Sequence, residues 1–113
     1  MSNAGGLKFD QDKAPMDLLD PFALTQVAAV LLFGARKYAR HNWRNGIKIS
    51  RLIAASLRHI MAFNDGEDFD SETGLSHLAH AMCCLMFALW MMEHRPDMDD
   101  RWRDEKGKTE DGK

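Results

Sequence analysis

Twelve consecutive apolar residues, 81–92, leave few folds open to this chain. The run falls short of the roughly 20 residues that a membrane-spanning helix needs. No segment alternates like a useful length of strand, whereas residues 70–94 carry two apolar stripes at helical spacing. One stripe is Leu75, Leu78, Met82, Leu85, Leu89 and Met92, and the other is Thr73, His77, His80, Cys84, Phe87 and Met91. A helix with two buried stripes has neighbours on both sides, which predicts an all-α fold.

Two further helices precede this one. Asp20-Pro21 predicts the start of the first, because aspartate caps helix N-termini and proline suits the first helical position. Residues 22–38 are apolar on nearly every face, so this helix should be buried on more than one side, inside a bundle or an oligomer interface. Gly34 interrupts it, and a glycine there favours close packing of another backbone. The segment before Asp20, 7–19, reads as an extended arm with at most one helical turn.

The second and third helices are delimited by turn residues. The second is predicted to begin at Ser50, acting as its N-cap, and to end at Asn64-Asp65-Gly66. The third is predicted to start near Asp70 or Ser71 and to stop at Arg95-Pro96. A short acidic loop joins the two helices, so they should pack as antiparallel neighbours.

The length of 113 residues allows one domain. We expect a flexible tail or expression scar over 1–6, a helical domain over 7–101 and a charged, disordered tail over 102–113. Three helices this apolar need a partner chain to cover them, so we expect core helices shared across a homo-oligomer, a dimer or tetramer.

The charge balance and the cysteines narrow the function classes. The formal net charge is −2, which argues against binding of a nucleic acid polymer. Adjacent Cys83 and Cys84 build no disulfide framework and suit a reducing compartment. No signal segment and no membrane span is predicted, so we expect a cytoplasmic protein.

Histidines and acids converge on the hairpin of the second and third helices. They are His59, Glu67, Asp68, Asp70, Glu72, His77 and His80. His59 lies eight residues before Glu67 and His77 ten after it, so the two imidazoles should stand at similar heights above the loop. Such groups between facing helices suit a divalent metal. The structural alternative is that Asp70 caps the third helix, that Glu72 favours its dipole and that the histidines are core residues.

A second group of residues is basic and aromatic. It consists of Arg36, Lys37, Tyr38, Arg40, Asn42, Trp43 and Arg44, with Arg51 and Arg58. Arginine and lysine bind phosphates, aromatic rings stack on bases, and asparagine can pair with a base edge. The structural alternative is a solvated loop anchored by one tryptophan. The arm residues Lys8, Asp10 and Lys13 form a third and weaker group.

Several short motifs follow one another along residues 7–101. They are Lys8-Phe9-Asp10-(two residues)-Lys13, Phe33-Gly34-Ala35-Arg36-Lys37-Tyr38, Asn42-Trp43-(two residues)-Gly46, Leu57-Arg58-His59, Gly66-Glu67-(two residues)-Asp70-(one residue)-Glu72-(one residue)-Gly74, His77-Leu78-Ala79-His80-Ala81 and Asp99-Asp100-Arg101. Together they resemble the N-terminal family of phage-encoded dATP/dGTP diphosphohydrolases, a MazG-like all-α group.

The resemblance implies a MazG-like helical bundle and a metal-dependent hydrolase, acting in the cytoplasm of the host cell if phage-encoded. Purine deoxynucleoside triphosphates would give the monophosphate and pyrophosphate, with Mg²⁺ or Mn²⁺ as cofactor. Catalytic residues would be His59, Glu67 and His77, and metal ligands Glu67, Asp70, Glu72 and His77. Substrate would be held by Lys8, Lys13, Lys37, Tyr38, Asn42, Trp43 and Arg58.

The chain departs from the usual MazG pattern. Enzymes of that group hold Mg²⁺ with a Glu-x-x-Glu on one helix and a Glu-x-x-Asp on the next, whereas here Arg58-His59 and His77-x-x-His80 stand on the helices. The metal ligands should therefore differ, or the metal should lie nearer the loop acids. The alternative function is a non-catalytic helical module that binds a nucleotide or dimerises within a phage protein.

Overall fold

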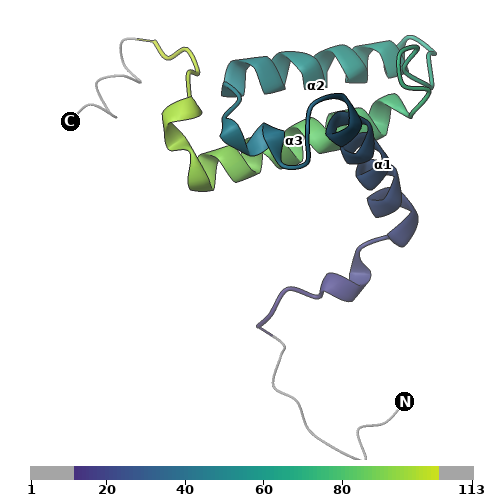
Figure 1. Ribbon diagram of the computed structural model, residues 1–113, viewed down its shortest axis with the longest axis horizontal. Coiled ribbons are helices and arrows are strands. Elements are labelled where there is room, and N and C mark those ends of the chain that lie inside the picture. Colours follow the sequence, from purple (N-terminus) through teal and green to yellow (C-terminus); the bar gives the residue numbers. More distant parts are fainter. Residues whose placement is uncertain (1–11, 105–113) are drawn as a thin grey trace, which may run out of the picture.

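Three helices make up the framework of the computed structural model, which describes residues 12–104 (Figure 1). They are α1 (Pro21–Lys37), α2 (Ile49–Asn64) and α3 (His77–His94). Short 3₁₀ turns accompany them: η1 (Met16–Leu18) lies before α1, η2 (Asn42–Asn45) between α1 and α2, and η3 (Pro96–Met98) after α3. An isolated bridge between Phe69 and Ser76 is the β pairing of this part of the chain. The predicted all-α class is confirmed.

Helices α2 and α3 run antiparallel and make most of the contacts between helices, while α1 crosses α3 on another side (Figure 1). Ile49, Leu52 and Met91 are the buried centre of their interface. Trp43, Ile47, Cys84, Phe87, Ala88, Trp90 and Met98 pack around that centre. The buried residues of α2 are thus Ile49, Leu52 and Ser56, which face α3 or the loops beside it.

The first helix begins as predicted. Asp20 Oδ2 accepts a hydrogen bond from the Ala23 N–H at 2.8 Å, and Pro21 occupies the first helical position. Two expectations about α1 are not met by the single chain, while burial in an oligomer interface stays a prediction. Within residues 12–104 it buries only Val27, because its other apolar side chains find no element to cover them. A methyl group added at Gly34 would meet no atom within 4 Å, so no backbone packs closely there.

The predicted capping role of Ser50 is wrong. Helix α2 starts one residue earlier, since the Lys48 carbonyl already accepts from the Arg51 and Leu52 N–H groups. The Ser50 N–H donates to Asp100 Oδ1 at 2.8 Å, and its hydroxyl donates to Asp100 Oδ2 at 2.5 Å. A carboxylate fifty residues downstream therefore satisfies the start of the helix. The end at Asn64, followed by Gly66 with φ of +103°, is as predicted.

The predicted start of α3 near Asp70 or Ser71 is also wrong. The helix begins at His77, with Ser76 as the N-cap whose Oγ accepts from the Leu78 N–H at 3.0 Å. Residues 70–76 form a turn instead, in which the Asp70 N–H donates to the Leu75 carbonyl at 2.8 Å. Gly74, with φ of +73°, permits that reversal. Thr73 therefore precedes α3 and belongs to no stripe on it. Arg95-Pro96 ends the helix as expected.

The segment after α3 folds back over the loop before α2. Arg95 Nη1 donates to the Asn45 carbonyl at 2.6 Å, and Arg95 also pairs with Asp97. Gly46 lies beneath, with φ of +119°, and a Cβ there would stand 3.0 Å from both Arg95 Nη1 and Met98 Sδ. Glycine is therefore required at this position for both conformation and space.

Two helices leave apolar stripes exposed. On α3 these are Leu78, Met82, Leu85, Leu89 and Met92, and on α2 they are Ile53, Leu57 and Ile60. The α3 stripe, predicted to be buried, is uncovered within the described chain, and Leu89 is 75% exposed. A 4-3-4-3 spacing is the pattern by which helices pack on other helices. Within residues 12–104, none of the helices combines the length and the hydropathy that a bilayer span needs.

Removing the cap of α2 should destabilise the fold. Asp100→Ala leaves the Ser50 N–H and hydroxyl without their acceptor, so we expect a melting temperature lower by a few degrees. Thermal unfolding followed by circular dichroism measures it. Glu93→Gln, an exposed change on α3, should melt as wild type, and an equally stable D100A variant would contradict the capping role.

The exposed stripes predict self-association at micromolar concentration. Leu85→Lys combined with Leu89→Lys places two charges on the α3 stripe, which should convert an oligomer into a monomer while helicity is retained. Sedimentation velocity distinguishes the species. Glu93→Lys adds a charge beside the stripe and should leave the association state unchanged. A wild-type chain that sediments as a compact monomer would refute the expectation.

Candidate functional site

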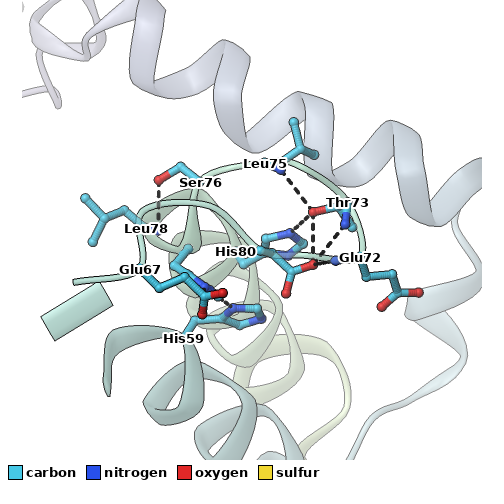
Figure 2. Close-up of polar contacts among 10 residues, drawn as sticks. His59, Glu67, Glu72, Thr73, Leu75, Ser76, Leu78 and His80 are labelled. Carbon is cyan, nitrogen blue, oxygen red and sulfur yellow. Dashed lines mark hydrogen bonds and ion pairs between the residues drawn. The ribbon is translucent and has the colours of Figure 1, made fainter. Parts of the chain in front are cut away.

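Three imidazoles meet where α2 and α3 pack together, close to the loop that joins them (Figure 2). Nδ1 of His59, on α2, lies 2.8 Å from Nδ1 of His77, on α3. The His80 ring stacks on the His59 ring, with centroids 4.5 Å apart and planes 9° from parallel. The prediction that His59 and His77 stand at matching heights is confirmed.

Glu67 fixes the orientation of His77. Its Oε1 lies 3.0 Å from His77 Nε2, so a carboxylate acceptor assigns the proton of His77 to Nε2. The Nδ1 of a neutral His77 is then a bare acceptor, and His59 donates to it from its own Nδ1. Nε2 of His59 keeps no hydrogen-bond partner within residues 12–104. That nitrogen is available to a cation or a proton.

Asp70 lies beside the imidazoles and is held by the turn that follows it. Its Oδ2 accepts from the N–H of Glu72 at 3.1 Å and from the N–H of Thr73 at 3.0 Å. Partial burial opposes ionisation, but these donors and the nearby His80 hold the pKa of Asp70 below its usual value. One carboxylate oxygen of Asp70 and one ring nitrogen each of His59 and His77 lie within 4.8 Å of one another.

Burial also lowers the pKa values of two histidines. Desolvation lowers the pKa of His59, and the neighbouring His80 and His77 lower it further. Desolvation is the main cause of the lowered pKa of His80 as well. Both imidazoles are therefore neutral near pH 7, which is the form that binds metal ions.

Glu72 points away from this cluster. Its Oε2 forms a 3.2 Å ion pair with Nζ of Lys37 at the end of α1, and the pair raises the pKa of Lys37. Both side chains are about half exposed or more. Two residues predicted for different tasks, metal binding and phosphate binding, thus contact each other. Asp68 is exposed in the same loop.

Three of the predicted substrate residues line a single pocket. Tyr38, Asn42 and Trp43 contribute to a cavity of about 840 Å³ between α1, the loop 39–47 and α3. Arg40 and Arg44 lie at the same pocket, above an apolar floor that includes Phe87 and Trp90. Volumes of this size hold nucleotide-sized ligands.

Trp43 is already in contact with other side chains of the loop and of α3. Phe87 stacks on it at 4.3 Å, Trp90 meets it edge-on at 5.1 Å, and the Arg44 guanidinium lies 4.3 Å from the ring centroid. Tyr38, in contrast, is 65% exposed. Stacking of a base on Trp43 stays a prediction, and Tyr38 presents the more open ring.

The remaining predicted residues lie apart from these two groups or outside the described chain. Lys13 is exposed ahead of η1, and Arg58 is exposed on α2 next to His59. Lys8 lies outside the described residues. Sequence reasoning missed Thr73, whose hydroxyl lies 2.7 Å from His80 Nε2. The Asp-x-x-Thr spacing from Asp70 was its available signal, because such turns place the hydroxyl beside the carboxylate.

Comparison with known proteins agrees with the motifs. The family model for "dATP/dGTP diphosphohydrolase, N-terminal" matches residues 3–101. A "dATP/dGTP diphosphohydrolase" of Salmonella phage PMBT28 is 50% identical over 96 residues, which is 85% of this chain. The chain spans 33% of the length of that protein. No solved structure matches this chain. With almost its whole length matched, the chain belongs to the dATP/dGTP diphosphohydrolase N-terminal family.

Proposed function

We propose that this chain carries a divalent-metal centre at which purine deoxynucleoside triphosphates, dATP or dGTP, are hydrolysed to the monophosphate and pyrophosphate. The main support is the convergence of His59, Asp70 and His77, whose ligand atoms lie within 4.8 Å of one another. The name of the phage relative supports the substrate class.

The side chains of the cluster suit a divalent ion. The two Nδ1 atoms of His59 and His77 stand 2.8 Å apart, close to the about 3 Å between neighbouring ligand atoms on one ion. Glu67 holds the far nitrogen of His77, as carboxylates commonly do for metal-binding histidines. Of Mg²⁺ and Mn²⁺, two imidazoles with one carboxylate favour Mn²⁺. Glu67 then orients His77, and Glu72 pairs with Lys37.

The reaction adds one water to the triphosphate. When the water oxygen forms a bond to the α-phosphorus, the bond from that phosphorus to the α,β-bridging oxygen breaks and pyrophosphate leaves. When the water attacks the β-phosphorus instead, the bond from that phosphorus to the same bridging oxygen breaks and the monophosphate leaves. A bound divalent ion would lower the pKa of that water and neutralise charge on the phosphate oxygens. An imidazole of the cluster would take the water's proton. His59 has an unpaired Nε2 for that task only in the form whose Nδ1 keeps its proton and does not hold the ion.

Substrate reaches the cluster from the pocket beside α1. The base and sugar would occupy the cavity that Tyr38, Asn42 and Trp43 line. Lys37, which precedes the pocket residue Tyr38, would exchange Glu72 for a phosphate. Arg58 and the arm lysines Lys8 and Lys13 would add positive charge. A cytoplasmic homo-oligomer, a dimer or tetramer, is part of the proposal, supported by the exposed stripes of α2 and α3.

The alternative is a non-catalytic module that binds a nucleotide or dimerises. Its support is that the chain spans a third of its phage relative, so catalysis can require the remainder of such a protein. A dimerisation module has no use for three imidazoles and a carboxylate in contact, which favours the enzymatic proposal.

Metal titration and pyrophosphate release test the proposal together. With Mn²⁺, the wild-type chain should bind one ion and release pyrophosphate from dATP or dGTP, and a chelator should abolish the release. His59→Asn should reduce Mn²⁺ affinity about 10- to 100-fold, since it removes a proposed ligand. Glu72→Gln is the matched variant from the same cluster of acids and should keep the affinity.

Three outcomes would change the proposal, for Glu72, for catalysis and for the metal centre respectively. A large loss of affinity in E72Q with unchanged melting would return Glu72 to the metal ligands. Metal binding without pyrophosphate release would favour the non-catalytic module. Absence of Mn²⁺ and Mg²⁺ binding in the wild-type chain would refute the metal centre.

The lowered histidine pKa values predict that the metal-free chain loses stability in acid. The unfolded chain binds protons on His59 and His80 near pH 6.5, and the folded chain does so only at lower pH. The contribution of these two histidines to the free energy of unfolding is therefore fully present above pH 6.5. It is lost as the pH falls through their pKa values in the folded chain. Urea unfolding at pH 7.5 and pH 5.5 measures the difference, and His59→Asn should reduce it. Equal stability at both values would contradict the burial of these imidazoles.

A further inference from the structure

We propose that Thr73 is a positioning residue, whose hydroxyl locks His80 and Asp70 in the arrangement that the metal centre requires. This inference rests on the proposed function, because it concerns the same cluster. Thr73 lies before α3, in the turn that follows Asp70 and Glu72 and precedes His77. Its hydroxyl contacts Asp70 of that turn and His80 of α3 (Figure 2).

The hydroxyl of Thr73 uses every hydrogen-bonding position that it has. Its oxygen lies 3.2 Å from Asp70 Oδ2, 2.7 Å from His80 Nε2 and 3.2 Å from the N–H of Leu75. An ionised carboxylate only accepts, so the hydroxyl proton goes to Asp70. Its two lone pairs then accept from the Leu75 N–H and from His80 Nε2–H.

This pattern assigns one tautomer to His80. If Nε2 of His80 carried no proton, the hydroxyl would have to donate to it, and two oxygens without a proton would face each other between Thr73 and Asp70. The proton of His80 is therefore on Nε2. A hydroxyl fixed by a charged acceptor and a backbone donor thus controls the orientation of an imidazole seven residues away.

His80 transmits this control to His59. Its ring lies parallel to the His59 ring at 4.5 Å, so a rotation of His80 would collide with His59 or leave it unsupported. Thr73 also holds Asp70 directly, through its hydroxyl and its N–H. Two of the three groups proposed to bind the ion are therefore positioned by one residue that does not itself bind it.

The experiment compares Thr73→Val with Thr73→Ser in the full chain, with Mn²⁺ as the probe. Valine has the shape of threonine without the hydroxyl, whereas serine keeps the hydroxyl and loses the methyl group. We expect T73V to bind Mn²⁺ about 10- to 100-fold more weakly than wild type, and T73S to keep the affinity. Calorimetry or the electron paramagnetic resonance signal of free Mn²⁺ measures both.

Thr25→Val supplies a matched control. Thr25 lies exposed on α1, and its hydroxyl bonds only to the Pro21 and Phe22 carbonyls of its own helix. The variant should bind Mn²⁺ as wild type does. Equal affinity in T73V and wild type would overturn the inference and leave the metal centre intact. Equal losses in T73V and T73S would assign the effect to the methyl group and overturn it as well.

A second readout does not depend on the metal. Two-dimensional ¹H–¹⁵N spectra of the histidine rings distinguish the Nε2–H from the Nδ1–H tautomer. In the metal-free wild type and in T73S, His80 should be in the Nε2–H form, and in T73V it should become a mixture. An unchanged His80 spectrum in T73V would refute the role of Thr73, even if the wild-type chain bound no ion. Thr73→Ala repeats the comparison if the valine variant does not fold.

Discussion

The antiparallel packing of α2 against α3 determines where the groups of the candidate site lie. Ile49 and Leu52 at the start of α2 pack against Met91 near the end of α3. This buried contact sets the axial register of the two helices, and therefore which residues face each other at their other ends. There, His59 and His77 come within hydrogen-bonding distance. A change in the apolar contact by one helical turn, about 5.4 Å, would separate the two imidazoles completely.

The turn of residues 65–76 supplies the acids of the candidate site, whereas the helices supply its histidines. Glu67 reaches back to His77, and Asp70 is surrounded by N–H donors from the residues after it. An additional bond, from the His77 N–H to the Asp68 carbonyl, ties the turn to the first residue of α3. The acids are thus held by backbone geometry as much as by side-chain contacts, so the cluster is largely formed before any ligand arrives.

Local rules predicted much of this structure, and long-range contacts account for the errors. Three helices, their antiparallel hairpin and the pairing of His59 with His77 followed from periodicity and loop length. Asp70 resembled an N-cap because it precedes Ser71 and Glu72, but its N–H bonds to the Leu75 carbonyl and closes a turn instead. Competition between a turn and a helix start is decided by the neighbouring chain, which spacing alone does not reveal.

In the candidate site too, local rules predicted some positions and long-range contacts decided the others. Helical spacing placed the histidines correctly, whereas it could not show that Glu72 would pair with Lys37, because α1 is distant in the sequence. The contacts of Trp43 with Phe87 and Arg44 likewise depend on how the loop folds over α3. The role of Thr73 was overlooked because the third helix was predicted to start before it, which placed it on a helical stripe with His77 and His80. Its distance of three residues from Asp70 is typical of side-chain turns.

The bond between Ser50 and Asp100 has a consequence for the order in which the chain folds. Helix α2 is synthesised before Asp100, and until Asp100 is in place the polar groups at the start of the helix have only water as a partner. The loop that must close spans fifty residues and includes all of α3. Completion of the first turn of α2 is therefore a late event, which reports that the hairpin has already assembled.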